Sequence, residues 1–206
     1  MISLNEKINH VINETINNYL LREALNNTDY PLYHFTTVES ACDILASNSL
    51  RGSWHRGYAN SKEDQHGICF TRNPKYQVWT ESCVQFVFDT QELQKLARHA
   101  KLVPYQDPSW EGFGEQEERL ISTNGQPCNI KNIDKAVKQI NIFLYDLYEY
   151  VFEEVEGSYM YEVVEYLKEM FGNNLYKSKI HFLGNKNNKK EYTFDEAIEY
   201  LTEDIE

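Results

Sequence analysis

The sequence has few positively charged residues for its size. Its 206 residues carry 20 lysines and arginines against 32 aspartates and glutamates, which gives a formal net charge of −12. Nucleic acid phosphates and anionic lipids are also negative, so this charge opposes tight non-specific binding to either unless a local basic patch overrides it. The composition therefore argues against a protein that coats DNA or adheres to an acidic membrane.

Long apolar runs are also missing. No stretch reaches the eighteen or so apolar residues that a membrane-spanning helix needs. The N-terminal stretch MISLNEKINHVINETINNYL contains too many Asn and Glu residues for the apolar part of a secretory signal. We therefore expect a cytoplasmic protein that makes no membrane contact.

Paired cysteines are a third absence. The four cysteines, Cys42, Cys69, Cys83 and Cys128, form no CxxC motif. Because the cytosol keeps thiols reduced, we expect these side chains to be free and mostly buried. His66 and Cys69 form one isolated HxxC pair, whereas a zinc site needs about four ligands, so we expect no metal site.

The sequence does contain enough apolar material for a core. Hydrophobic residues make up 41% of the chain and aromatic residues 14%, with 15 tyrosines, more than a disordered acidic chain carries. The length suits one domain. We expect a single domain with an N-terminal helix over residues 1–30, a core over 31–144 and a mostly helical extension over 145–206.

Short apolar and alternating segments predict the strands of that core. They lie at 32–35, 68–71, 84–89, 117–123, 139–144 and 179–185. Helical periodicity predicts helices at 3–24, 38–45, 90–100 and 133–138, two more after Asp146 that are split at Gly157, and a last one after Thr193. The irregular, unequal connections favour an α+β fold over a doubly wound sheet.

Turn-forming residues and capping patterns mark the boundaries. The stretches 51–67 and 101–114 lack periodicity and predict long loops, and 73–82 predicts a turn with a short helix. A threonine followed three residues later by a glutamate predicts capping boxes at Thr36 with Glu39 and at Thr193 with Glu196.

Three blocks in order, LYHFTT with ACDILASNSL, then GICFTRN, then EQEERLI, resemble the ADP-ribosyltransferase superfamily. The first block is most similar to DarT-type toxins, which ADP-ribosylate DNA bases. The resemblance covers roughly residues 32–121 and implies two split antiparallel sheets. The chain departs from many relatives by having His-Phe where they have His-Gly, and only Thr71 represents the second block.

The resemblance implies roles for individual residues in binding NAD. His34 would bond a ribose hydroxyl, while the backbone at Phe35 and the side chain of Thr36 would hold the nicotinamide end. Thr71 would belong to the same site. A ring stacked on nicotinamide would come from one of Tyr76, Tyr58 and Trp54, with no preference among them.

The same resemblance implies the catalytic groups. Glu118 matches the catalytic glutamate, with Glu117 as its neighbour and alternative. A carboxylate of this kind stabilises the oxocarbenium-like sugar formed when the nicotinamide bond breaks, and it can also act as a general base. Arginines suit the diphosphate of NAD, because their fork matches phosphate geometry; Arg72 is best placed, with Arg56 and Arg51 as alternatives.

Each of these residues also has a structural interpretation. His34 at a strand end can be a satisfied structural histidine, Thr36 can be only a helix cap, EQEERL can be a solvated turn, and Arg72 can simply pair with a carboxylate.

The expected function is transfer of ADP-ribose from NAD to a macromolecule by a toxin, phage effector or defence component. The resemblance indicates a nucleic acid base as acceptor, whereas the negative charge favours a protein. A tRNA 2′-phosphotransferase-like reaction is disfavoured by the sparse basic residues.

A non-catalytic alternative comes from the acidic, tyrosine-rich helices after Asp146. Such a surface would bind a basic protein partner or an antitoxin, or would imitate nucleic acid.

Overall fold

The fold is α+β with a mixed sheet. A computed structural model describes the chain at residues 30–54, 66–75, 82–105, 117–123, 127–151, 159–185, 187 and 189–203. The helix predicted at 3–24 lies outside these residues. Within them, no helix combines the length and the apolar character needed to cross a membrane.

The large sheet has nine strands in the order β11-β10-β9-β5-β1-β4-β7-β6, with β3 paired to β4 off this path. The pairing of β9 with β10 is parallel, and the other pairings are antiparallel. The strands are β1 (Leu32–Thr36), β3 (Ser53–Trp54), β4 (His66–Thr71), β5 (Val84–Phe88), β6 (Ala100–Tyr105), β7 (Glu117–Ser122), β9 (Val137–Phe143), β10 (Ile180–Leu183) and β11 (Glu191–Tyr192).

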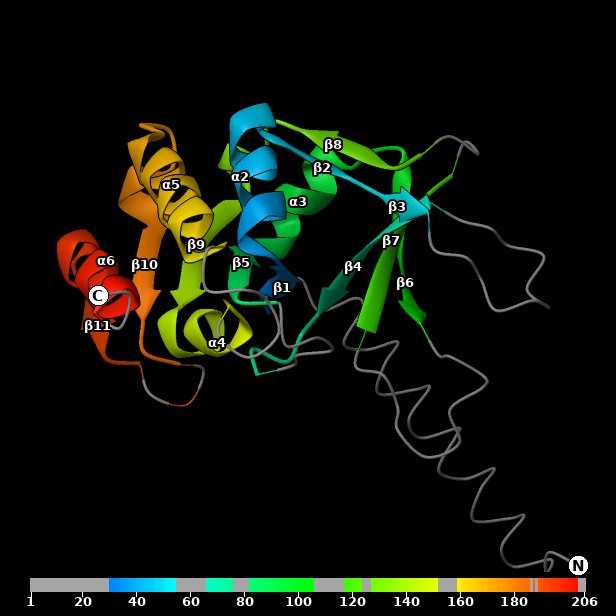
Figure 1. The fold of residues 1–206 in the computed structure, drawn as a ribbon. Coiled ribbons are helices and arrows are strands. Elements are labelled where there is room, and N and C mark those ends of the chain that lie inside the picture. Colours follow the sequence, from blue (N-terminus) through cyan, green and yellow to red (C-terminus); the bar gives the residue numbers. More distant parts are fainter. Residues whose placement is uncertain are drawn as a thin grey trace, which may run out of the picture.

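A second sheet and several helices complete the described part of the chain. The second sheet pairs β2 (Ser49–Arg51) with β8 (Asn129–Lys131). The helices are α2 (Val38–Ser47), α3 (Thr90–Leu96), α4 (Leu144–Glu149), α5 (Tyr159–Gly172) and α6 (Phe194–Thr202), with short 3-10 turns η1 (Ile133–Lys135) and η3 (Lys177–Lys179) (Figure 1).

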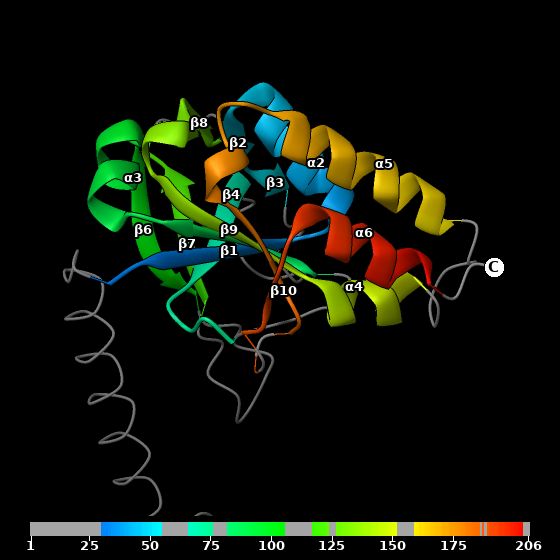
Figure 2. The same ribbon diagram turned by 90° about the vertical axis from the view of Figure 1, so that its left-hand side faces the viewer.

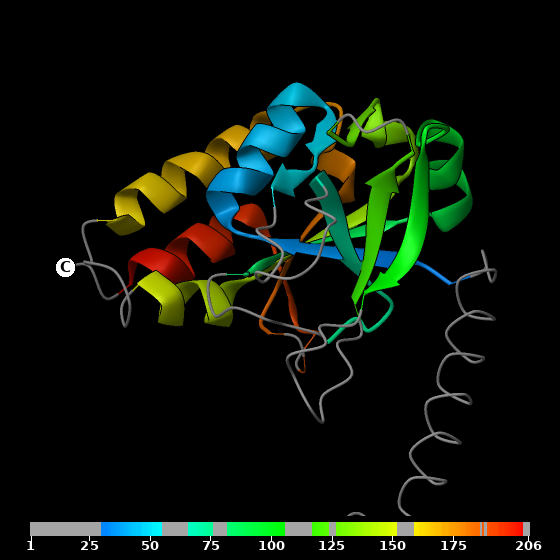
Figure 3. The ribbon, with the colours of Figure 1, turned by 90° about the vertical axis from the view of Figure 1, so that its right-hand side faces the viewer.

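The two faces of the large sheet differ in polarity. One face carries an apolar cluster that includes Phe70, Phe86 and Phe88, as the alternation in VQFVF predicts. In Figures 2 and 3, α2 and α5 lie above the sheet, whereas the turn after β4 lies below it. On that lower face Tyr33 and Phe35 are only partly buried.

The C-terminal elements extend this core. β10 lies beside β9, and Phe182 of β10 contacts both Phe171 of α5 and Phe194 of α6. The rings of Phe171 and Phe194 stack with centroids 4.5 Å apart. Aromatic contacts of this kind hold α5 and α6 together over the apolar face of the sheet.

The helix caps confirm one predicted box and correct the other. At α6 the Thr193 side chain and the Glu196 side chain cap each other's backbone, as predicted. At α2 the cap is Thr37, whose hydroxyl accepts a hydrogen bond from the Ser40 amide, so the box predicted from Thr36 is wrong by one residue. Thr36 remains extended because it pairs with Val84 in the sheet.

Three predicted boundaries also change. The loop predicted at 51–67 contains β3 and the start of β4, and the one at 101–114 begins inside β6. Pro104 is tolerated there because β6 ends the sheet order and pairs only with β7. The helix predicted at 133–138 is only the turn η1, since Val137 already pairs with Phe88.

A network centred on Asn48 fixes the end of α2. Asn48 has a left-handed backbone with φ 47° and ψ 41°. Its amide nitrogen donates to the Asp134 carboxylate at 2.7 Å, and its side-chain oxygen accepts from the Asp134 amide and from the Tyr176 hydroxyl. The network therefore joins α2, η1 and the segment after α5, which are distant in sequence.

We predict that Asn48→Ala lowers the free energy of unfolding by about 2–4 kcal/mol, because it adds backbone strain and removes three partly buried hydrogen bonds. Asn48→Gly keeps the left-handed backbone and loses only the side-chain bonds, so its loss should be smaller. Urea denaturation of both variants measures the difference. Equal losses of unfolding free energy in the two variants would show that the left-handed backbone of residue 48 contributes nothing to stability.

Candidate functional site

His34 lies in the middle of the sheet on β1. Its ring packs against Phe70 and Phe86, with centroids 5.8 and 6.4 Å away. Its Nδ1 lies 2.8 Å from the carbonyl oxygen of Cys69 on β4. Because a carbonyl only accepts, Nδ1 carries the proton, and in the neutral ring Nε2 is then the acceptor.

Glu118 and Arg72 form a close ion pair. Arg72 donates from Nε to Glu118 Oε1 at 2.7 Å and from Nη2 to Oε2 at 3.4 Å, although the residues are 46 apart in sequence. The Glu118 residue is only 4% exposed. A carboxylate at this depth needs such a partner, because desolvating an isolated charge is costly.

The histidine and the ion pair share one face of the sheet. Tyr33 lies opposite Thr71, so the next position along β1 places His34 beside Phe70, and Phe70 lies opposite Glu118 on β7. His34 and Glu118 are therefore separated by one strand, roughly 10 Å between backbones.

The remaining candidates occupy different positions. Phe35 pairs with Gln85, and Thr36 ends β1. Thr71, only 2% exposed, accepts a hydrogen bond from the Asn73 amide and so shapes the turn that carries Arg72.

Three candidates cannot be placed fully. Glu117 is the first residue of β7 and lies opposite Thr71, but its side chain is outside the described part of the structure. Arg56 and Tyr76 also lie outside the described residues. Arg51 is exposed on β2, in the second sheet.

The site includes contacts that sequence reasoning missed. The Tyr30 carbonyl accepts from Arg72 Nη1 at 3.2 Å and also from the Thr90 hydroxyl. The Cys69 carbonyl orients His34. Backbone carbonyls carry no side-chain signature, so no sequence pattern could have identified them.

The cluster formed by Arg72, Glu118 and His34 can hold an anion and orient a carboxylate. Arg72 supplies a planar cation that suits phosphate or carboxylate, Glu118 supplies a fixed anion, and His34 supplies a ring with a defined tautomer. Among the described residues, no group of three or more His, Cys, Asp or Glu side chains is arranged to hold a metal ion.

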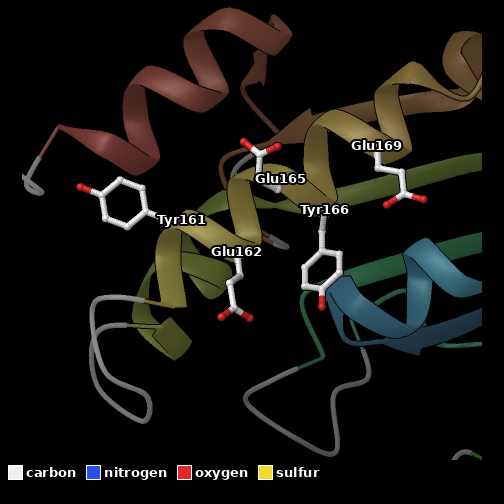
Figure 4. A pocket seen from close by; sticks show the side chains of 5 residues that line it. All are labelled: Tyr161, Glu162, Glu165, Tyr166 and Glu169. Carbon is white, nitrogen blue, oxygen red and sulfur yellow. The ribbon is translucent and has the colours of Figure 1, made fainter.

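A second candidate surface lies on α5. A shallow hollow of about 370 Å³ is lined by Tyr161, Glu162, Glu165, Tyr166 and Glu169 (Figure 4). Figure 4 shows Tyr166 pointing from α5 towards α2. Burial and then the nearby Glu39 charge raise the pKa of Tyr159, at the start of α5, to about 12, so this ring stays neutral at physiological pH.

The four cysteines, all among the described residues, are thiols that form no disulfide, and three of them are buried, as predicted. Burial, followed by a hydrogen bond and charge from Glu169, raises the pKa of the Cys42 thiol to about 12. Burial raises the pKa of Cys128 to about 11. These two thiols are therefore protonated at neutral pH, which makes them poor nucleophiles.

Neither a family model nor a curated protein matches this chain.

We predict that Arg72→Met lowers the free energy of unfolding by about 3 kcal/mol, because it leaves a buried carboxylate without its ion partner. Arg72→Met combined with Glu118→Gln should recover part of that loss. Lys95→Met removes an exposed ion pair with Glu92 and should leave the urea midpoint nearly unchanged. Urea denaturation measures the free energy of unfolding of each variant. If the losses of Arg72→Met and Glu118→Gln simply add up to the loss of the double variant, the two residues are not energetically coupled.

We predict that the alkaline stability of the protein depends on Glu169. Above about pH 9 the unfolded Cys42 thiol ionises while the folded one stays protonated. The free energy of unfolding should therefore fall by up to ~1.4 kcal/mol per pH unit until the folded thiol also ionises. Glu169→Gln lowers the pKa of the folded thiol and should make the fall shallower.

Glu165→Gln is the matched control for this change, because Glu165 lies one turn away on α5 and pairs with Lys168. Urea denaturation between pH 8 and 11 makes the comparison. Identical pH profiles for the two variants would rule out the influence of Glu169 on Cys42.

Proposed function

We propose that the protein is an NAD-dependent ADP-ribosyltransferase that modifies a macromolecule, with a nucleic acid base as the first acceptor to test. The observation that supports this proposal is the meeting of Arg72 and Glu118 on the sheet face that also carries His34. These residues come from three separate sequence blocks. That the α+β fold is the one of this superfamily belongs to the proposal.

The reaction breaks the bond between the ribose C1′ and the nicotinamide nitrogen. The electron pair of that bond leaves with nicotinamide and neutralises its ring. The acceptor nitrogen forms the new bond to C1′ and releases its proton to a base. Glu118 stabilises the positive charge that develops on the sugar and can receive that proton, the second role being worth about 10²–10⁴ in rate.

Arg72 and His34 position the groups in this scheme. Arg72 holds both oxygens of Glu118, which fixes the direction of the carboxylate, and its charge suits the diphosphate of NAD. The Cys69 carbonyl fixes a proton of His34 on Nδ1, so Nε2 is the ring atom that would accept from a ribose hydroxyl when the ring is neutral.

We predict that the purified protein releases nicotinamide from NAD when a suitable acceptor is present. DNA, RNA and lysate protein are tested separately, and transfer is followed by mass. Glu118→Gln keeps the shape but removes the charge and should lower the rate by about 10²-fold or more. His34→Ala should mainly raise KM for NAD, because it removes a binding contact.

Glu165→Gln, on the exposed face of α5, is the matched control and should leave the rate unchanged. Transfer to protein alone would assign a protein acceptor. If NAD neither binds in calorimetry nor loses nicotinamide with any acceptor, the transferase proposal is refuted.

A second candidate function, non-catalytic binding of a basic partner or imitation of nucleic acid, is favoured by the hollow on α5. Its lining combines three glutamates with two tyrosines, and Tyr161 is 63% exposed. Carboxylates and aromatic rings together suit arginine-rich segments. Refutation of the transferase would leave this candidate.

A further inference from the structure

A row of hydrogen-bonded amide side chains, which we call the amide chain, lies on the lower face of the sheet, opposite the apolar face, and two of its three members are buried. Gln139 donates to Asn141 at 2.7 Å, Asn141 donates to Gln85 at 2.7 Å, and Gln85 donates to the Pro74 carbonyl at 2.8 Å. Gln85 is 2% exposed and Asn141 is 8% exposed. Burying an amide side chain costs free energy unless the amide is hydrogen-bonded. We therefore expect this row of amides to have a specific structural role.

The topology shows where the chain of amides acts. β4 and β5 flank β1 and are both antiparallel to it, so the connection between them must cross β1. Arg72 is the first residue of that connection, and Pro74 follows two residues later. The turn lies on the lower side of the sheet (Figures 2 and 3), which is the side that Gln85 faces.

The turn has further bonds of its own. Thr71 Oγ1 accepts from the Asn73 amide, and Asn73 Oδ1 accepts from the Lys75 amide. These bonds shape the turn but join it only to itself and to the end of β4. The Gln85 bond ties it to a different strand, on the other side of β1.

We propose that Gln85 is a positioning residue: by holding the Pro74 carbonyl it fixes the turn that delivers Arg72 to Glu118. Gln85 also lies opposite Phe35 in the sheet, so it is next to a second position of the proposed NAD site. The catalytic meaning of this role rests on the proposed transferase function. The positioning itself is a property of the fold and is testable without it.

The test compares Gln85→Met with Val87→Ala. Methionine has a similar length but cannot donate to Pro74, whereas Val87 lies on the same face of β5 and forms no part of the amide chain. Two readouts report the turn directly: the NMR signal of the Arg72 Nε–H group, assigned by its loss in Arg72→Lys, and hydrogen exchange of the Asn73 and Lys75 amides.

In Gln85→Met we expect the Arg72 signal to move towards that of a solvated arginine and the two amides to exchange at least tenfold faster. Val87→Ala should leave both readouts as in the wild type, even if it lowers stability. Where the wild type is active, Gln85→Met should lose about tenfold or more in kcat/KM, since small misplacements of catalytic groups are costly.

Each result bears on one proposal separately. Unchanged Arg72 and turn signals in folded Gln85→Met would overturn the positioning role, whatever the activity. A wild type without any NAD reaction would refute the transferase and leave the NMR result valid. If the methionine variant does not fold, Gln85→Asn, which keeps an amide that is too short to reach Pro74, carries the same test.

Discussion

The position of β1 between two strands that run antiparallel to it constrains much of this structure. The chain leaves β4 on one side of β1 and re-enters the sheet as β5 on the other, so the connection at residues 72–83 must pass across β1. A connection of this kind has no ladder of its own and depends on side-chain bonds for a defined path. The turn at Arg72 has such bonds to Thr71, Gln85 and Glu118.

The ion pair and the amide chain hold the turn at Arg72 from opposite faces of the sheet. The ion pair places a charge from the turn against a buried carboxylate on β7, on the apolar side of the sheet. The amides hold the backbone of the same turn from the lower side. A turn held from both faces has little freedom, which is the condition that a preorganised site requires.

Sequence reasoning predicted the elements whose signals are local. Alternation identified β5, a Thr-to-Glu spacing identified the cap of α6, and short apolar runs identified β1, β4, β7 and β10. It failed where the sheet overrides local preference. Pro104 indicated a loop, yet an edge strand tolerates proline.

For the candidate site, sequence reasoning named the individual residues but not which of them meet in the structure. Arg72 and Glu118 were selected for separate roles, whereas the structure pairs them with each other. Gln85 gave only the signal of a polar residue between apolar ones, and its bond to Pro74 depends on a crossover that no local pattern reveals.

The edges of the large sheet have a consequence for association between copies. At one end β6 carries Pro104, which lacks an N–H group, and at the other end β11 is only two residues long. Edge strands with free backbone groups recruit further strands and promote aggregation. Because one edge is interrupted and the other is short, neither edge, as far as its residues are described, gives a long template for a strand of a neighbouring copy.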